Sequence, residues 1–438
     1  KDPQDGYDII STIDVYIQDI AHHALLKQLE HYSADHGCVV VMETKTGHIK
    51  AISNLGRADD GSYYETQNYA IAESHEPGST FKLMDLIAVL DDKKADTSTV
   101  YDSKGGRIEY YGRSVKDSNG KGYGKISLAR GFELSSNTVL VQSVMNSYKD
   151  NPKLFVNRIN SYGLNKPLGL PIEGEGKPYI PQPGSKGWSG TTLPWMAFGY
   201  NVSITPLQTL TLYNAVANNG IMVKPIFVSE IKEWNKTIKN YNTQVINPKI
   251  CSQETLDKVH AVLENVVKKG TGSKLYSKDF SMAGKTGTAQ VNYKDKSKLY
   301  YASSFVGYFP AVEPKYSCIV IVHKPNVATG YYGADVAGPV FKRIAQKIFT
   351  DSPSMNHVKD INAKVANQEK NYTSYYKKVE IENNIVPNVK GMDGMDAIAL
   401  LENLGLKVKV VGLGKVKLQS LTSGQVFNKN QTITIELS

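Results

Sequence analysis

The hydrophobic residues of this chain change their spacing twice along the sequence. Apolar runs at Val39–Met42 and Ile49–Ile52 predict two strands, joined by a turn at Lys45-Thr46-Gly47. Further apolar runs rich in β-branched and aromatic residues follow Ser281, at Ser303–Phe309 and Ser317–His323. Strands are therefore expected near both ends of the first 350 residues.

The stretch between these strands has the spacing of helices. From about residue 79 to residue 260 apolar side chains recur every three or four positions, as in Phe81–Leu90, Val139–Met145 and Leu207–Ala217. Ser98–Lys125 is the exception, because it is rich in Gly, Ser and Tyr and has the composition of an insertion. A last helix is predicted over Asp335–Phe349. One sheet built from both ends of the chain, with helices on it and an all-helical lobe, gives an α+β fold.

The C-terminal residues have a pattern of their own. A helix is predicted over Asp393–Leu404, with Gly405 as its stop, and strands over Leu406–Val411 and Thr432–Leu437. The preceding stretch is polar and has no apolar period, which is typical of a linker. Three segments are predicted: a main domain over residues 1–350, a linker over 351–384 and a small βα module over 385–438.

Composition changes this picture little. The chain is 41% hydrophobic and 21% charged, with a net charge of +9 from scattered basic residues, and it carries no nucleic-acid-binding motif. Its three cysteines contain no CxxC pair, and no spacing of His, Cys, Asp or Glu indicates a metal site, so no metal and no cofactor are predicted. His22, His23 and His323 are interpreted as structural histidines.

The start of the chain bears on its location. No run of about 18 apolar residues is present, and the sequence begins at Lys1 and opens directly into an expected element over Ile9–Leu29. We interpret this as a trimmed chain and expect a membrane anchor upstream of it.

Three short motifs carry the chemistry. They are Ser79-Thr-Phe-Lys82, Ser135-Ser136-Asn137 and Lys285-Thr286-Gly287. Each is weak alone, because the chain also contains Ser374-Tyr-Tyr-Lys377, Ser354-Met-Asn356 and Lys45-Thr46-Gly47, which lie in polar or turn segments. Ser79 instead follows Glu76-Pro77-Gly78 and opens an apolar helix, so the first three motifs are the candidates.

The spacing of the first motif places a lysine beside a serine. On a helix, Lys82 lies one turn from Ser79 and on the same face. A serine nucleophile needs a base, and a lysine acts as one only if its pKa falls through burial or through a second cation, a role assigned here to Lys285. Ser135 is placed to pass a proton to the leaving nitrogen, and Asn137 to hold Lys82. No histidine motif supports a Ser-His-Asp triad.

In these three motifs, taken in this order, the chain resembles the penicillin-binding proteins. The resemblance covers residues 5–350 and is most specific at Gly6–Gln18, Glu76–Lys82, Phe198–Gln208 and Gly284–Gln290. The last two stretches are similar to those of the class B, monofunctional enzymes of septal division. Residues 385–438 resemble a PASTA module, although Leu421-Thr422-Ser423 stands where that module often has a proline.

The resemblance implies a fold, a site and a substrate. The fold would be that of the penicillin-binding and serine β-lactamase-like enzymes, with a central antiparallel sheet. Ser79, Lys82, Ser135, Asn137 and Lys285 would be catalytic, with the backbone N–H groups of Ser79 and Thr288 as the oxyanion hole. Substrate or β-lactam contacts would come from Ser136, Thr286, Gly287 and Thr288.

The implied reaction is the cross-linking of peptidoglycan stem peptides that end in D-Ala-D-Ala, through an acyl-enzyme on Ser79 that β-lactams also form. A membrane glycosyltransferase and divisome proteins are implied as partners, at the extracytoplasmic (periplasmic) face of the cell membrane. The motifs leave two alternatives open. One is a D,D-carboxypeptidase or β-lactamase, in which water replaces the acceptor amine, and the other is a non-catalytic β-lactam sensor or divisome scaffold.

Overall fold

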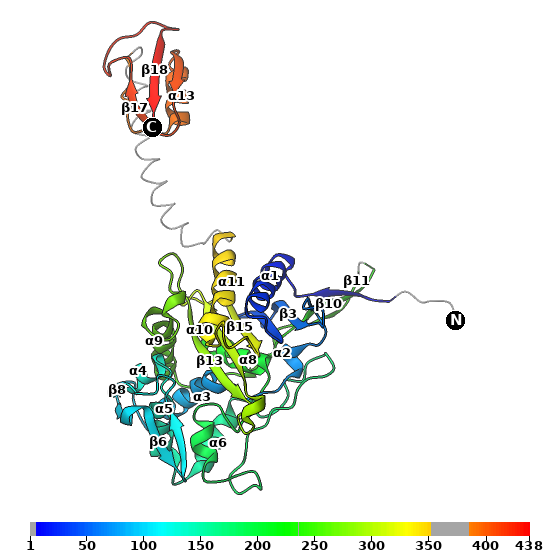
Figure 1. The fold of residues 1–438 in the computed structure, drawn as a ribbon. Coiled ribbons are helices and arrows are strands. Elements are labelled where there is room, and N and C mark those ends of the chain that lie inside the picture. Colours follow the sequence, from blue (N-terminus) through cyan, green and yellow to red (C-terminus); the bar gives the residue numbers. More distant parts are fainter. Residues whose placement is uncertain (1–5, 235, 352–384) are drawn as a thin grey trace. The chain divides into compact units, whose positions relative to one another are not determined.

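A computed structural model describes residues 6–351, apart from residue 235, and residues 385–438 (Figure 1). The chain divides into two compact units, residues 1–352 and residues 353–438. The predicted linker lies almost entirely outside the described residues, so its boundaries stay a prediction.

A six-stranded antiparallel sheet forms the centre of the first unit. Its strand order is β13-β14-β15-β2-β3-β4, so β15, from the end of the unit, pairs with β2, from its beginning. Both ends of this unit thus build one sheet, as the apolar pattern predicted. The strands are β2 (His36–Glu43), β3 (Ile49–Arg57), β4 (Tyr63–Tyr64), β13 (Ala283–Val291), β14 (Tyr300–Phe309) and β15 (Tyr316–His323).

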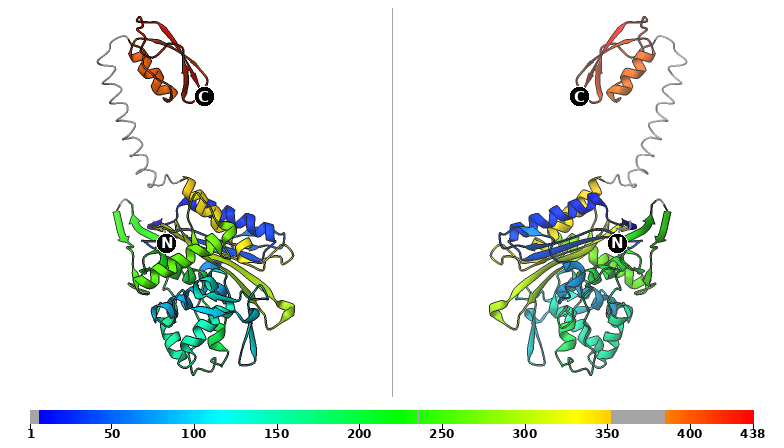
Figure 2. Two further views of the ribbon diagram at one scale, coloured as in Figure 1. Left: turned by 90° about the vertical axis from the view of Figure 1, so that its left-hand side faces the viewer. Right: turned by 90° about the vertical axis from the view of Figure 1, so that its right-hand side faces the viewer.

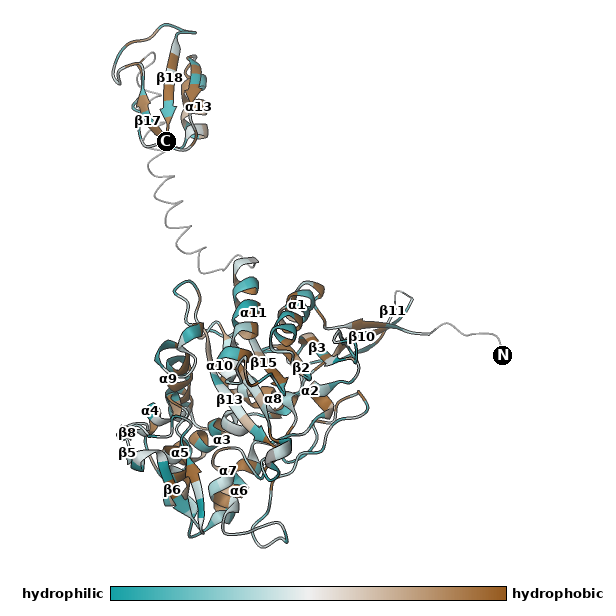
Figure 3. Cartoon of the chain, viewed as in Figure 1, coloured by the Kyte–Doolittle hydropathy of each residue, from teal (hydrophilic) through white to brown (hydrophobic). Residues whose placement is uncertain are grey.

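Both faces of this sheet are covered, which explains the apolar runs on its central strands. On β2, Val39 and Val41 face α1 (Val15–Tyr32) and α11 (Gly338–Asp351), whereas Val40 and Met42 face the other side. Figure 2 shows the two helices over one face and the helical lobe against the other. Hydrophobic residues gather on the central strands in Figure 3.

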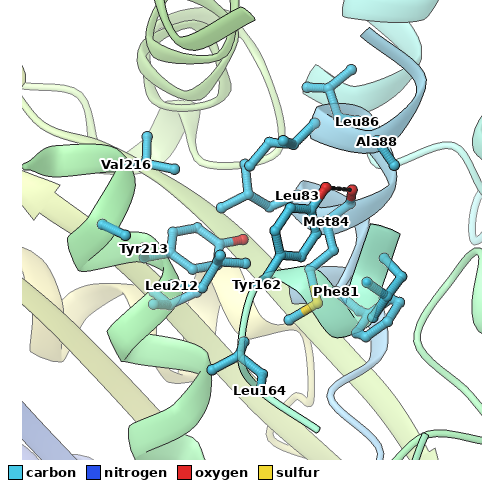
Figure 4. Packing of buried hydrophobic residues seen from close by; sticks show 14 of the residues in the cluster. Phe81, Leu83, Met84, Leu86, Ala88, Tyr162, Leu164, Leu212, Tyr213 and Val216 are labelled. Atoms are coloured by element: carbon cyan, nitrogen blue, oxygen red, sulfur yellow. Dashed lines mark hydrogen bonds between the residues drawn. The ribbon is translucent and has the colours of Figure 1, made fainter. Parts of the chain in front are cut away.

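The helical lobe packs around α3 (Lys82–Asp91) and α8 (Pro206–Ala217). Every residue of α8 is buried, as expected of a helix without a polar stripe. Figure 4 shows side chains of both helices in contact, with Tyr162 donating to the Met84 carbonyl at 3.3 Å. The other helices here are α2 (Tyr69–Ala72), α4 (Leu128–Glu133), α5 (Asn137–Tyr148), α6 (Pro152–Ser161), α7 (Thr192–Met196) and α9 (Gln253–Lys269). Helix α10 (Gly333–Val336) packs against α11 and β14, and its Val336 belongs to the cluster beneath α1 and α11.

Small sheets flank this core. β1 pairs with β10 and β10 with β11, while β9 pairs with β12, β5 with β8 and β6 with β7. The strands are β1 (Asp8–Ser11), β5 (Val100–Asp102), β6 (Arg107–Tyr110), β7 (Arg113–Lys116), β8 (Lys125–Ser127), β9 (Met222–Val223), β10 (Val228–Glu233), β11 (Lys236–Asn240) and β12 (Val245–Asn247).

The second unit has its own hydrophobic core. Helix α13 (Gly394–Asn403) packs on a three-stranded sheet of order β16-β18-β17, made of β16 (Lys407–Val411), β18 (Thr432–Leu437) and β17 (Val416–Gln419). Strands β16 and β18 are parallel. The helix, β16 and β18 lie where the sequence predicted them. β17 was not predicted.

Two further expectations differ from the structure. The expected single element over Ile9–Leu29 is a strand, β1, followed by helix α1, which begins after Asp14 caps it. β13 was not predicted as a strand, because Gly284, Lys285 and Gly287 give it neither alternation nor strand propensity. Among the described residues, no helix is both long and apolar enough to cross a membrane.

Candidate active site

Ser79 lies on a tight turn that leads into α3. The turn, Gly78–Thr80, is a short 3₁₀ helix, and Gly78 has a positive φ of 56°. The Gly78 N–H donates to the Gly199 carbonyl at 3.1 Å, and Tyr213 Oη donates to the Thr80 carbonyl at 2.9 Å. A Cβ at Gly199 would collide with the Gly78 backbone. The position of the serine is therefore fixed by close backbone contact.

Lys82 is completely buried, yet its amine makes three hydrogen bonds. Nζ donates to the Ser135 carbonyl at 2.8 Å, to Ser135 Oγ at 3.3 Å and to Asn137 Oδ1 at 2.6 Å. Burial lowers the pKa of Lys82 to about 7, although the charges of Asp117 and Asp85 act in the opposite direction. The amine is therefore poised to exchange a proton near neutral pH.

The three residues of the second motif have three separate structural tasks. Ser135 adopts a positive φ of 56°, which turns the chain so that its carbonyl and hydroxyl both face Lys82. Ser136 is the N-cap of α5, because its Oγ accepts from the Val139 N–H at 3.2 Å. Asn137 accepts from Lys82 and donates to the Lys116 carbonyl at 2.7 Å, so it links the lysine to β7.

Asp117 follows β7, inside the segment interpreted as an insertion. Its carboxylate accepts from Ser136 Oγ at 3.1 Å, and from the N–H and the hydroxyl of Thr138, both at 2.9 Å. The segment thus anchors the start of α5 and the motif on it. Sequence reasoning missed Asp117, since its motif partners lie some 20 residues away and no local spacing connects them.

Asp85 was also missed, although a lone acid within an apolar helix is a visible signal. It lies one turn after Lys82 on α3 and is completely buried. Neither carboxylate oxygen has a hydrogen-bond partner among the described residues. Burial raises the pKa of Asp85 well above its ordinary value, and Lys82 opposes this only in part. Burial thus disfavours the charged form of Asp85 beside the lysine.

Lys285 lies on β13 and is likewise completely buried. Its Nζ donates to the Thr286 carbonyl at 3.0 Å and lies 5.6 Å from the centre of the Phe132 ring. Burial lowers the pKa of Lys285 well below its ordinary value, and the charge of Lys82 lowers it further. The prediction from the sequence was the reverse effect, in which the charge of Lys285 lowers the pKa of Lys82. Burial, rather than a second cation, is the main cause of the low pKa of Lys82.

The residues after Lys285 alternate along an outer strand of the sheet. Thr286 Oγ1 lies 2.7 Å from Thr271 Oγ1, and Thr288 Oγ1 accepts from the Gly333 N–H at 2.9 Å. The Gln290 N–H donates to Tyr200 Oη at 2.8 Å, away from β14. Since backbone N–H groups two residues apart in a strand point the same way, the Thr288 N–H faces this open edge too.

A cavity of about 530 Å³ opens in front of Ser79. Aromatic side chains form much of its wall, while Ser79, Asn137 and Thr288 contribute the polar groups at which the three motifs meet. It is lined by Ser79, Ser114, Val115, Lys116, Asp117, Ser118, Asn137, Trp195, Phe198, Tyr200, Thr288, Gln290, Tyr293, Tyr301, Tyr331 and Tyr332.

Most of the candidate residues come together. Ser136 is buried, and its hydroxyl is bonded to Asp117 and the α5 backbone. The substrate contact predicted for Ser136 stays a prediction, while its side chain also positions α5. The Gly47 turn joins β2 to β3, with φ +80°, as predicted. Ser374 and Ser354 lie outside the described residues.

Two family models match the chain. The penicillin binding protein transpeptidase domain matches residues 37–346, and the PASTA domain matches residues 384–438. The first match contains all three motifs and most of the strands of the central sheet. The second contains α13 and its sheet.

Relatives and solved structures agree with these matches. Stage V sporulation protein D of Bacillus subtilis is 29% identical over 100% of this chain and 66% of its own length. The peptidoglycan D,D-transpeptidase FtsI of Buchnera aphidicola subsp. Baizongia pistaciae is 26% identical over 78% of this chain and 58% of its own. The chain thus spans less than two thirds of the length of these curated relatives.

Among solved structures, the transpeptidase domain of penicillin-binding protein 3 from Burkholderia pseudomallei matches with a TM-score of 0.66 at 25% identity, over 80% of this chain and 100% of that one. Penicillin-binding protein 3 from Mycobacterium tuberculosis, complexed with aztreonam, matches with a TM-score of 0.69 at 25% identity, over 79% of each chain.

Proposed function

Because the chain belongs to the penicillin-binding protein transpeptidase family, we propose that it is a peptidoglycan D,D-transpeptidase that cross-links stem peptides through an acyl-enzyme on Ser79. One observation carries most of this proposal. The amine of Lys82 is buried, held by Ser135 and Asn137, and has a pKa of about 7, one helical turn from a serine at the mouth of a cavity.

Acylation begins with the neutral amine of Lys82. Ser79 Oγ attacks the carbonyl carbon of the penultimate D-Ala, and its proton passes to Lys82 as the bond forms. An amine with the ordinary lysine pKa of about 10.4 would be neutral in well under one molecule in a thousand at pH 7. At a pKa of about 7, half of the molecules carry the neutral base.

The backbone N–H groups of Ser79 and Thr288 are proposed to bind the oxyanion of the tetrahedral intermediate. The support is the direction of the Gln290 N–H, which implies that the Thr288 N–H faces the open edge of β13. This edge packs against the turn that holds Ser79. An oxyanion donor of this kind stabilises the transition state by about 3–4 kcal/mol.

Collapse of the intermediate releases the terminal D-Ala. Its nitrogen takes a proton from Ser135 Oγ, which recovers one from Lys82 over the 3.3 Å contact between them. The amine of a second stem peptide then attacks the ester carbonyl and gives its proton to the regenerated base. A β-lactam enters the same first step, but its leaving nitrogen stays attached to the acyl group.

The terminal carboxylate of the donor is proposed to lie near Lys285, Thr286, Gly287 and Thr288. A substrate carboxylate beside Lys285 would raise the lowered pKa of that amine. The amine would then be charged while the substrate is bound, and its charge would attract the carboxylate. Thr288 already lines the cavity, whereas Thr286 would have to exchange its Thr271 partner for the substrate. Ser136 is proposed to act by positioning α5.

Labelling with a fluorescent penicillin tests this assignment. Mass spectrometry of the labelled peptide is expected to place the adduct on Ser79, and Ser79→Ala is expected to abolish it. Ser114→Ala is a matched control, because Ser114 also lines the cavity but belongs to β7 and is bonded to Glu109. An adduct on any other residue, or persistent labelling of Ser79→Ala, would contradict the proposal.

Two alternatives are separated by later steps. A β-lactamase would release the penicillin adduct rapidly to water, and a carboxypeptidase would pass the acyl group of a peptide donor to water, whereas a transpeptidase passes it to an amine. A sensor or scaffold would be acylated yet would turn over no peptide or thioester donor. Transfer of a donor acyl group to an added D-amino acid, dependent on Ser79, would support the transpeptidase over both.

In the cell, we propose that the chain acts in septal cell-wall synthesis at the extracytoplasmic face of the membrane, anchored by a segment upstream of this sequence. Peptidoglycan stem peptides and β-lactams would be its ligands, and a membrane glycosyltransferase and divisome proteins its partners. The support is the naming of relatives as a sporulation protein and as FtsI, together with the PASTA match. Co-purification from cross-linked dividing cells would test the partners.

A further inference from the structure

A second cavity adjoins the cavity of the candidate active site. It has a volume of about 850 Å³, and Trp195 and Tyr293 line both cavities, so the two meet at these side chains. Glu76 and Lys294 line the second cavity but not the first. We call this second space, lined by these four residues among others, the side cavity. A substrate attached to Ser79 can extend into it past Trp195 and Tyr293.

The backbone of Glu76 is fixed relative to the nucleophile. Glu76 lies three residues before Ser79. On one side of it, His75 and Ile204 exchange two backbone hydrogen bonds, of 3.2 Å and 3.1 Å. On the other side, the turn that carries the nucleophile is held by the backbone contacts described above. The carboxylate of Glu76 is therefore carried at a fixed place near the nucleophile.

The side chain of Glu76 uses only one of its two oxygens. Oε1 accepts from the Asn201 N–H at 2.8 Å and from Tyr293 Oη at 3.2 Å. In the part of the chain that the structure describes, Oε2 accepts no hydrogen bond and Glu76 forms no ion pair. One carboxylate oxygen is thus left for a ligand in the side cavity, while the other holds the group in place.

Burial favours a cationic partner for this carboxylate. Glu76 is half-buried, and burial raises the pKa of its carboxyl group, although its two hydrogen bonds and the charge of Lys294 act in the opposite direction. An ammonium group supplies a positive charge together with N–H donors, and such charge-assisted hydrogen bonds are roughly twice as strong as neutral ones. A ligand with an ammonium group would therefore complete the environment of Glu76.

Positive side chains line the same cavity. Lys294 and Arg113 are exposed at its wall, and neither forms an ion pair within the described residues. Lys294 is close enough to Glu76 for its charge to lower the pKa of that carboxyl group. The side cavity thus has a carboxylate with cations nearby. A complementary ligand has an ammonium group and a carboxylate close together, as at the zwitterionic end of an amino acid.

We propose that the side cavity binds the zwitterionic end of a diamino acid of a stem peptide, with the ammonium group on Glu76 and the carboxylate toward Lys294. This inference rests on the proposed function and names the chemistry of one part of its substrate. Cross-linking needs a stem peptide with a side-chain amine, which a diamino acid supplies. A diamino diacid such as diaminopimelate has both charges at the end of its side chain, whereas lysine has only the ammonium group.

Two stem peptides meet at the site, and either of them can carry this end. In the donor, the diamino acid precedes the D-Ala that is acylated, and one residue spans about 3.3–3.6 Å, so its side chain can reach the adjoining cavity. In the acceptor, the zwitterionic end carries the amine that attacks the ester. The chemistry that is recognised is the same in both cases, and two assays separate the sources.

Glu76→Gln and Glu65→Gln form a matched pair of variants. Gln at position 76 can still accept from the Asn201 N–H and Tyr293 Oη, so this change removes the charge and keeps the structural contacts. Glu65 Oε1 likewise accepts from one hydroxyl, of Ser53 at 3.0 Å, and from one backbone N–H, of Asn54 at 2.9 Å. Glu65 lines neither cavity, so it controls for the loss of a hydrogen-bonded carboxylate elsewhere.

The donor assay uses the full chain and two thioester donors that differ only in the residue before D-Ala, which is diaminopimelate or norleucine, with hydroxylamine as acceptor. The wild type is expected to have a kcat/KM about 10- to 100-fold higher for the diaminopimelate donor, as for a hydrogen bond to a charged group. Glu76→Gln is expected to lose this preference and Glu65→Gln to keep it. Lys294→Gln, at an exposed position, is expected to reduce it about two- to fivefold.

The acceptor assay uses the norleucine donor and compares two acceptors. D-Norleucine has a zwitterionic end, whereas hydroxylamine is uncharged at slightly alkaline pH. If the acceptor occupies the side cavity, Glu76→Gln is expected to lower transfer to D-norleucine about 10- to 100-fold more than transfer to hydroxylamine. Glu65→Gln is expected to leave the ratio of the two transfers unchanged.

An effect of Glu76→Gln in either assay supports the proposal and identifies the stem peptide that the side cavity binds. The proposal is overturned by a Glu76→Gln protein that is folded by circular dichroism and matches the wild type in both assays. Should Glu76→Gln not fold, Lys294→Gln tests the same cavity, and wild-type behaviour of that variant in both assays would overturn the proposal as well.

Failure of the proposed function is recognised separately. It would appear as a wild type that fluorescent penicillin does not label on Ser79, or that transfers neither donor. Calorimetric titration with diaminopimelyl-D-alanine then decides the inference, because binding needs no turnover. Binding to Glu76→Gln is expected to be at least about tenfold weaker than to the wild type. Equal binding to both, or binding to neither, would overturn the inference.

Discussion

The pKa of Lys82 leads to a quantitative prediction about the pH dependence of acylation. Its value of about 7, against 10.5 for an ordinary lysine, corresponds to about 3.5 pH units. At about 1.4 kcal/mol for each unit, burial disfavours the charged amine by a net of about 5 kcal/mol relative to water, although the charges of Asp117 and Asp85 oppose it. The fraction of neutral Lys82 amine therefore decreases as the pH falls through about 7.

The second-order rate constant for acylation by a penicillin should therefore fall about tenfold for each pH unit below 7 and level off above it. Stopped-flow measurements between pH 5 and pH 9, with the folded state checked by circular dichroism at each pH, would give this profile. Asp117→Asn should move the midpoint to lower pH, because the Asp117 carboxylate raises the pKa of Lys82. Asp60→Asn, in an exposed turn, is the control and should leave it in place.

Two outcomes would refute this reasoning. A rate that is constant from pH 5 to pH 8 would mean that Lys82 is not the titrating base. A midpoint near 10 would mean that water reaches the amine and that the buried state seen here is not the reactive one. The first result would move the search for the base away from Lys82, and the second would keep Lys82 as the base with an ordinary pKa.

Three further predictions concern the framework of the site. Gly199→Ala should lose acylation and much stability, because its Cβ would collide with the Gly78 backbone. Gly163→Ala has the same φ of 83°, but its Cβ would make only an ordinary contact with Ile246, at 3.6 Å, and it should cost only about 1–2 kcal/mol in urea unfolding. Ser136→Ala and Ser252→Ala each remove a helix cap and should each cost about 1–2 kcal/mol, yet only the first should slow acylation. Removal of residues 353–438 should leave penicillin acylation unchanged, because each unit has its own core.

The sequence predicted the central sheet well, for a physical reason. β2, β3, β14 and β15 contain apolar runs because helices cover both faces of the sheet, and such runs are recognisable without an alignment. β13 lacked this signal. Its glycines permit close approach to Ser304 and the Ser79 turn, a requirement that comes from the site rather than from strand formation.

The candidate site was predictable where its residues are neighbours in sequence. The spacing of Ser79 and Lys82 indicated one helical face, and the structure has the turn and helix in that relation. Asp117 could not be predicted, because it supports Ser136 and Thr138 through contacts across the fold.

Helix α3 shows how the fold and the chemistry depend on the same burial. From Lys82 to Leu90 every residue of this helix is buried, and all but Lys82 and Asp85 are apolar. A helix selected for stability alone would have an apolar residue at both positions, since an unpaired buried ionisable group is costly. Lys82 keeps three hydrogen bonds and has a pKa near neutrality, whereas neither carboxylate oxygen of Asp85 has a partner among the described residues. Burial raises the pKa of Asp85 well above its ordinary value, which disfavours a negative charge beside Lys82. The two departures from the apolar pattern of α3 therefore lie together at the reactive lysine. Residues that stability alone would not favour are expected mainly at functional sites.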